Sequence, residues 1–127
     1  MAKDILINII KSIYFLLDKG DISHFHKIDC EEIWYFHEGC GMKVTMLTEN
    51  GKEEFLLGND IENGHHAMVL IPKWAIFAAE NLKDDGFTFV SCATTPNFTY
   101  EGFRLVEKQE IKEKFPEIAE NIEYLAY

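Results

Sequence analysis

The sequence predicts an all-β fold, an antiparallel sandwich or barrel, that ends in a helical segment. Three observations lead to this fold class: short runs rich in β-branched and aromatic residues, turn residues between them at regular spacing, and a change of hydrophobic period near the C-terminus. Short strands joined by turns are typical of antiparallel sandwiches and barrels. A small barrel of this kind can hold one small ligand among its inward-facing side chains.

The expected strands occupy the first two-thirds of the chain. The clearest is residues 42–47, where apolar residues alternate with Lys43 and Thr45 in the period-2 pattern of a half-buried strand. The pair Asn50-Gly51 that follows is a strong hairpin signal, because both residue types tolerate positive φ. Further strands are expected at residues 13–17, 32–37, 54–58, 67–71, 74–80 and 87–93.

The end of the chain changes to a helical period. Apolar residues recur there at intervals of three and four, the pattern of an amphipathic helix, at Ile111, Phe115, Ile118, Ile122 and Leu125. Pro116 is expected to break this stripe and to open its second helical piece. We therefore expect one domain over residues 1–127, with a barrel at about 11–106 and a helical segment at about 107–127.

Composition narrows the class of partner. The net charge of −10 argues against nucleic acid and anionic membranes as partners. Three cysteines make a poor disulfide framework, which favours a cytoplasmic location. The apolar stretch at residues 5–17 is expected to be a core element, because it is shorter than the ~20 residues that span a bilayer and has no signal-peptide cleavage pattern.

Two histidines and a glutamate mark the candidate site. His24 and His26 are two residues apart, so they share one face if they lie in a strand. If Glu32 faces the barrel interior, Trp34 and Phe36 face it too. The sequence therefore predicts an aromatic-walled cavity that contains imidazole and carboxylate groups.

This stretch resembles the first motif of the cupin superfamily, whose members are double-stranded β-helix (jelly-roll) barrels. Residues 23–39 read SHFHKIDCEEIWYFHEG, and the counterparts of the motif's histidines, glutamate and glycine are His24, His26, Glu32 and Gly39. A second cupin motif is similar to residues 64–77, where Gly64 and Pro72 are in place. The histidine that most cupins carry in that motif is replaced by Phe77, and the usual glycine after the proline by Trp74.

Three separate blocks resemble the RmlC-like, cupin-5 type branch of single-domain cupins: residues 20–39, 56–64 and 89–105. Members of that branch are often likened to sugar-nucleotide epimerases. The chain differs from the branch in its shorter N-terminal segment, which would leave one edge of the barrel open or covered by a neighbour. Because an uncovered edge strand favours pairing with another chain, we expect a homodimer.

The resemblance and the residues together predict that the barrel binds a small molecule, with sugar-like or carbonyl-bearing molecules as the first candidates. His26 and Glu32 would act as general base and orienting partner, and Tyr14 as the acid, in epimerase- or isomerase-type chemistry. Further ligand-binding side chains are expected at Trp34, Phe36, His66, Met68 and Phe77.

Two alternatives stay open. The first is a metal-dependent cupin enzyme in which His24, His26 and Glu32 hold a divalent Fe, Mn, Ni or Zn ion, since two histidines and one carboxylate can form a facial triad. Phe77 weakens this alternative because its ring cannot coordinate a metal, and His37 is expected to face outward. The second alternative is a non-catalytic dimeric scaffold with a degenerate pocket.

Overall fold

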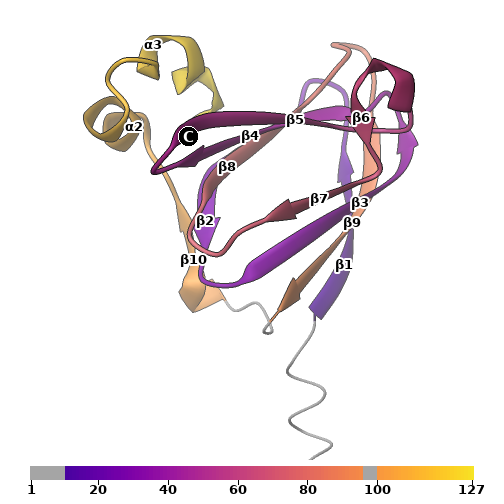
Figure 1. Ribbon diagram of the computed structural model, residues 1–127, viewed down its shortest axis with the longest axis horizontal. Helices are drawn as coiled ribbons and strands as arrows, with labels where there is room; N and C mark the ends of the chain where they lie inside the picture. Colours follow the sequence, from indigo (N-terminus) through magenta and orange to yellow (C-terminus); the bar gives the residue numbers. More distant parts are fainter. Residues whose placement is uncertain (1–10, 96–99) are drawn as a thin grey trace, which may run out of the picture.

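Two β-sheets pack face to face in the computed structural model, which describes residues 11–95 and 100–127 (Figure 1). Within these residues, sheet A contains, in spatial order, β1 (Lys11–Leu17), β9 (Thr88–Thr95), β3 (Glu31–Gly39) and β7 (Met68–Ile71). Sheet B contains β10 (Phe103–Leu105), β2 (Ile22–Ile28), β8 (Ile76–Asn81), β4 (Met42–Thr48), β5 (Gly51–Leu57) and β6 (His65–His66). Apart from β4, β5 and β6, successive strands alternate between the sheets, as in a jelly roll.

Most of the expected strands are present at their expected places. The Asn50-Gly51 hairpin joins β4 to β5, and Gly51 has a φ of 100°, as the turn requires. The strand expected at 74–80 begins only at Ile76, because Trp74 has a φ of 72° and is therefore not extended. The strands β2, β6 and β10 are not among those that the sequence predicts.

The main core lies between the two sheets. The alternation expected in β4 is correct for its inward face, where Met42, Val44 and Met46 are buried in this core. On the opposite face, however, Thr45 is also buried. Sheet B is therefore covered on both faces, which a period-2 pattern by itself does not predict.

A second core lies between sheet B and the C-terminal helices α2 (Lys108–Lys114), α3 (Ala119–Ile122) and η3 (Glu123–Leu125) (Figure 1). Its members include Phe25, Leu47 and Ile76 from the strands, and Ile111, Ile122 and Leu125 from the helices. The predicted helical stripe thus packs on its own domain. Pro116 does interrupt it, although α3 begins at Ala119 rather than at the proline.

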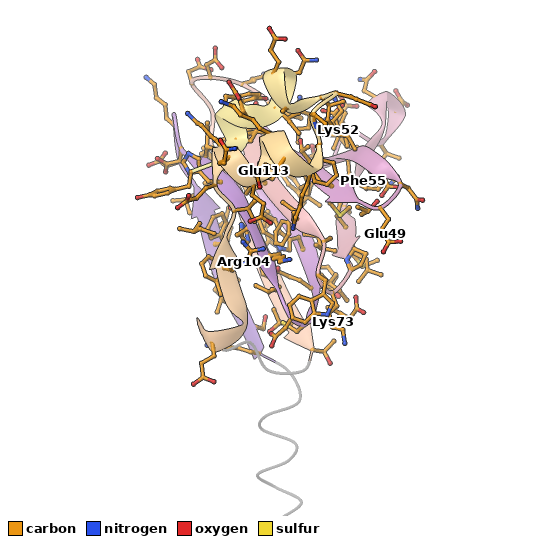
Figure 2. The ribbon with its side chains drawn as sticks, turned by 90° about the vertical axis from the view of Figure 1, so that its left-hand side faces the viewer. Glu49, Lys52, Phe55, Lys73, Arg104 and Glu113 are labelled. Atoms are coloured by element: carbon orange, nitrogen blue, oxygen red, sulfur yellow. The ribbon has the colours of Figure 1, made fainter. Side chains whose placement is uncertain are left out.

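An ion pair attaches the first helix to the edge of sheet B. The guanidinium of Arg104 on β10 donates two hydrogen bonds to the carboxylate of Glu110 on α2, and Lys114 donates a third. Figure 2 looks onto this covered side, with Arg104 lying below Glu113 of α2. The contact connects the helices to β10, one of the strands that contribute to the cavity described below.

The outer face of sheet A, in contrast, exposes large apolar side chains. These side chains are Tyr14 and Leu16 of β1, Tyr35 of β3, and Met68 and Leu70 of β7. Such a face is the candidate surface for the homodimer, which stays a prediction.

Residues 5–10 of the expected core element, and with them the short N-terminus, lie outside the described residues. No helix within the described ranges is long and apolar enough to cross a membrane.

We expect Ile111→Ala to lower the free energy of unfolding by about 2–5 kcal/mol, because Ile111 is fully buried in the second core and its truncation would leave a cavity there. Urea denaturation measures this change. Ile61→Ala is the matched control, since Ile61 is 63% exposed. Equal changes in the free energy of unfolding for the two substitutions would contradict a stabilising role of the second core.

Candidate functional site

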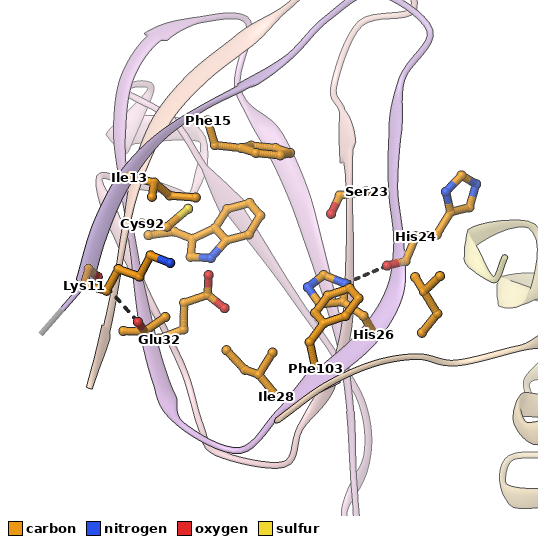
Figure 3. A pocket seen from close by; sticks show the side chains of 13 residues that line it. Lys11, Ile13, Phe15, Ser23, His24, His26, Ile28, Glu32, Cys92 and Phe103 are labelled. Atoms are coloured by element: carbon orange, nitrogen blue, oxygen red, sulfur yellow. Dashed lines mark hydrogen bonds between the residues drawn. The ribbon is translucent and has the colours of Figure 1, made fainter. Parts of the chain in front are cut away.

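A cavity of about 370 Å³ lies between the inner faces of the two sheets (Figure 3). Its lining comes from β1, β2, β3, β9 and β10, so it lies at the side of the sandwich where the edge strands β1 and β10 are located. Most of the wall is apolar, with Ile13, Phe15, Ile28, Phe103 and Leu105 among its members. The titratable groups that interrupt this wall are the basis of the site's chemistry.

Glu32 projects from β3 into the cavity and is only 8% exposed. Burial raises the pKa of its carboxyl from 4.5 to about 7, since the charged form loses hydration. The indole N–H of Trp34 opposes this rise in pKa. That N–H does not reach hydrogen-bonding geometry, however, because Nε1 of Trp34 and Oε2 of Glu32 are both buried without a hydrogen-bond partner.

His26 faces the same cavity from β2 in the opposite sheet (Figure 3). Its Nδ1 lies 2.7 Å from the carbonyl oxygen of His24, so Nδ1 carries the proton and donates it to that oxygen. The lone pair of the neutral ring is then on Nε2. Burial lowers the pKa of His26, and the hydrogen bond to His24 opposes this effect in part. The ring packs against Phe77, with 4.1 Å between ring centroids.

His24 and His26 both contribute to the cavity lining, but their rings point in different directions, contrary to the expectation from their spacing. The pairing of β2 with β8 shifts register between Ser23 and His26, which is a β-bulge. The ring of His24 consequently turns away from Glu32 and contacts Tyr127, 5.8 Å between ring centroids (Figure 3). Within the described residues, no group of three or more His, Cys, Asp or Glu side chains is placed to hold a metal ion. The triad of His24, His26 and Glu32 is therefore not assembled.

Tyr14, the predicted acid, lies outside the cavity. Its side chain is 75% exposed on the outer face of sheet A and stacks on Phe89, with 5.4 Å between ring centroids. Because neighbouring residues of a strand point to opposite faces, Ile13 and Phe15 face the cavity instead. The expectation that Tyr14 lines the cavity is therefore wrong. His37, expected to face outward, does so and bonds Ser91 at 2.8 Å.

Met68 and His66, two of the expected ligand-binding residues, do not line the cavity. Met68 pairs with Tyr35 and Val69 with Trp34, so Met68 takes the outward face of Tyr35. Met68 is accordingly 53% exposed, whereas Val69 is buried. His66 lies in β6, which pairs with β5 at the far edge of sheet B, and is exposed outside the cavity.

The predicted aromatic wall is only partly present. Trp34 lines the cavity, while its role in ligand binding stays a prediction. Phe77 is fully buried behind His26, and Phe36 packs against the same core without lining the cavity. The sequence reasoning missed Cys92 and Thr94, although the period-2 pattern of β9 places both on one face. It had no signal for Phe103, because β10 is too short to show a pattern.

Comparison with known proteins identifies the family. The sequence profile described as Cupin_5, cupin superfamily (DUF985), matches residues 7–106. The chain belongs to this cupin family. Comparison with curated proteins finds no match.

Solved structures agree with the family. Protein SO0799 from Shewanella oneidensis is 33% identical, with a TM-score of 0.87 over 94% of this chain and 75% of that one. A hypothetical protein from Leishmania major is 24% identical, with a TM-score of 0.84 over 93% of this chain and 76% of that one. Oxalate decarboxylase from Bacillus subtilis, at 19% identity and a TM-score of 0.64 over 94% of this cupin and 32% of that chain, shares the fold.

The raised pKa of Glu32 makes the stability of this cupin depend on pH. The folded protein binds the Glu32 proton more tightly than the unfolded chain does, so this contribution to stability is lost as the pH rises from 4.5 through about 7. The neutral amide in Glu32→Gln avoids the loss. We expect this variant to be more stable than the parent at pH about 8, by on the order of 3 kcal/mol, and the difference to shrink toward pH about 4.5.

Urea denaturation at several pH values measures this difference. Glu38→Gln is the matched control, because Glu38 lies on the same strand but is exposed. A pH-independent difference between Glu32→Gln and the parent would show that Glu32 does not titrate in this range.

Proposed function

We propose that this cupin binds a small carbonyl-bearing molecule in the cavity and catalyses proton transfer at the carbon next to the carbonyl. One observation carries the proposal: His26 and Glu32 face the same, mostly apolar cavity from opposite sheets, and burial moves their pKa values in opposite directions. Pairs of groups whose environments separate their protonation states in this way suit general acid–base catalysis.

The neutral ring of His26 would be the general base. Its Nε2 is the nitrogen left for a substrate, since Nδ1 bonds the carbonyl of His24. That bond also fixes the tautomer and the orientation of the ring. Nε2 would take the proton from the carbon next to the substrate carbonyl.

Glu32 would be the acid, in place of Tyr14. With a pKa of about 7, its carboxyl is protonated in a large fraction of molecules at neutral pH. The protonated carboxyl can donate a hydrogen bond to the substrate carbonyl oxygen and stabilise the enol that forms. Return of the proton to the opposite face of the same carbon would give an epimer. In an α-hydroxy carbonyl compound, return of the proton to the former carbonyl carbon, with the proton of the neighbouring hydroxyl passing to the Glu32 carboxylate, would give an isomer. Sugar-like ligands fall within this class because they carry carbonyl and hydroxyl groups.

Hydrogen–deuterium exchange tests the proposal directly. We expect the protein to accelerate deuterium uptake from D₂O at the carbons of hydroxyacetone that adjoin its carbonyl, measured by proton NMR. His26→Gln should reduce the enzymatic rate by about 10²–10⁴-fold, because the base is removed. Tyr14→Phe is the control and should leave the rate unchanged, since Tyr14 lies on the outer face. Exchange no faster than in buffer would contradict the proposal.

The metal-dependent alternative has less support. His26 and Glu32 face one cavity, but the ring of His24 contacts Tyr127 and Phe77 offers no ligand atom. We therefore expect metal analysis of the purified protein to find less than one equivalent of Fe, Mn, Ni or Zn. A stoichiometric metal that is lost in His26→Ala would favour the metal-dependent enzyme instead.

The scaffold alternative rests on the burial of Phe77 where most cupins have a histidine. It predicts that no small molecule binds the cavity. One saturable ligand in a thermal-shift screen would be incompatible with it.

A further inference from the structure

We infer that the ligand of this cavity places one uncharged group between Glu32 and Trp34, a hydroxyl or a primary amide that donates one hydrogen bond and accepts another. This inference rests on the proposed ligand-binding cavity and narrows the class of ligand it takes. It does not depend on whether the bound molecule reacts.

Two unpartnered polar atoms point to this group. Oε2 of Glu32 and Nε1 of Trp34 are both buried, and both lack a hydrogen-bond partner. Glu32 as a whole is more than nine-tenths buried. The two residues are two apart on β3, so their side chains leave the same face of the strand. The indole N–H is near enough to lower the pKa of Glu32, yet neither atom satisfies the other.

The two atoms have complementary needs. The indole N–H can only donate, and the ionised carboxylate can only accept. Each buried polar atom without a partner is unfavourable, so a ligand that serves both gains more than one that serves a single atom. A hydroxyl or primary amide does this with one functional group. An ether accepts but does not donate, and a carboxylate ligand would place a second negative charge beside Glu32.

The rest of the wall suits an apolar body attached to this group. Ile13, Phe15, Ile28 and Leu105 line the cavity around it. A ligand with a short apolar ring or chain and one hydroxyl or amide therefore matches both parts of the wall.

Titratable groups from several elements surround the Glu32 carboxyl. Lys11 lines the cavity from β1, His26 from β2 and Cys92 from β9, and Cys30 lies in the turn before β3. Burial raises the pKa of both thiols, so they stay neutral, and burial lowers the pKa of His26. Glu32 is thus the group among these acids that changes charge near neutral pH. Above that pH it only accepts, and below it the carboxyl can donate.

Four probes of similar size test the inference by isothermal titration calorimetry: benzyl alcohol, benzamide, anisole and benzoate. At pH about 8 we expect benzyl alcohol and benzamide to bind at least about tenfold more tightly than anisole, and benzoate to bind most weakly. At pH about 5.5 the preference for benzyl alcohol over anisole should narrow, because a protonated Glu32 can donate to the ether oxygen.

Variants assign the preference to the two residues. Glu32→Gln should narrow the gap between benzyl alcohol and anisole at pH about 8 to the gap of the parent at pH about 5.5, and should make the gap independent of pH, because an amide donates as well as accepts. Trp34→Phe should weaken binding of benzyl alcohol and of anisole alike and leave the gap between them, because both oxygens accept from the indole N–H. Glu38→Gln, on the exposed part of β3, should change neither affinity. If Trp34→Phe does not fold, the Glu32→Gln result alone decides.

The outcomes separate this inference from the proposed function. Equal affinity for benzyl alcohol and anisole at pH about 8 would overturn the inference and leave small-molecule binding intact. A gap at pH about 8 that persists unchanged in Glu32→Gln would overturn it as well. Absence of binding by all four probes would also overturn it, while the exchange of hydroxyacetone, which uses none of these probes, would still judge the proposed chemistry.

Discussion

The burial of the Glu32 carboxyl between two sheets is the constraint on which the site depends. A carboxyl group in an apolar wall loses hydration, which moves its pKa to about 7 and leaves Oε2 without a partner. A buried group of this kind lowers the stability of the ionised protein, so its position has to be held by the surrounding strands. In this cupin, β7 and β9 both pair with β3 and hold Glu32 and Trp34 in the middle of sheet A.

The opposite wall of the cavity, which carries His26, belongs to sheet B and is supported by packing on both of its faces. His26 lies on β2, which pairs with β8 on one side and β10 on the other. The outer face of sheet B is covered by the C-terminal helices, so this wall has apolar packing on both sides. The bulge in β2 separates the directions of the two histidines: His26 enters the cavity, and His24 turns toward Tyr127. The same bulge therefore favours acid–base chemistry over a metal centre.

The two buried cores have different relations to the cavity. The core between the sheets contributes Trp34 and Cys92 to the cavity wall. The members of the core under the helices do not line the cavity. Sheet A has no comparable cover within the described residues, and its outer face presents aromatic and aliphatic side chains to solvent. Ligand binding and any pairing of chains would consequently use opposite faces of the same sheet.

The sequence by itself determined the features that depend on local periodicity. These are the strand that carries Glu32 and Trp34 on one face, the Asn50-Gly51 hairpin and the helical stripe, because the period of side chains is set by the backbone of one element. Tertiary structure decided the rest. The direction of His24 depends on a bulge against β8, the exposure of Met68 on its pairing with β3, and the outward position of Tyr14 on which face of β1 meets the core. Each of these depends on a partner strand distant in sequence, which no local pattern specifies.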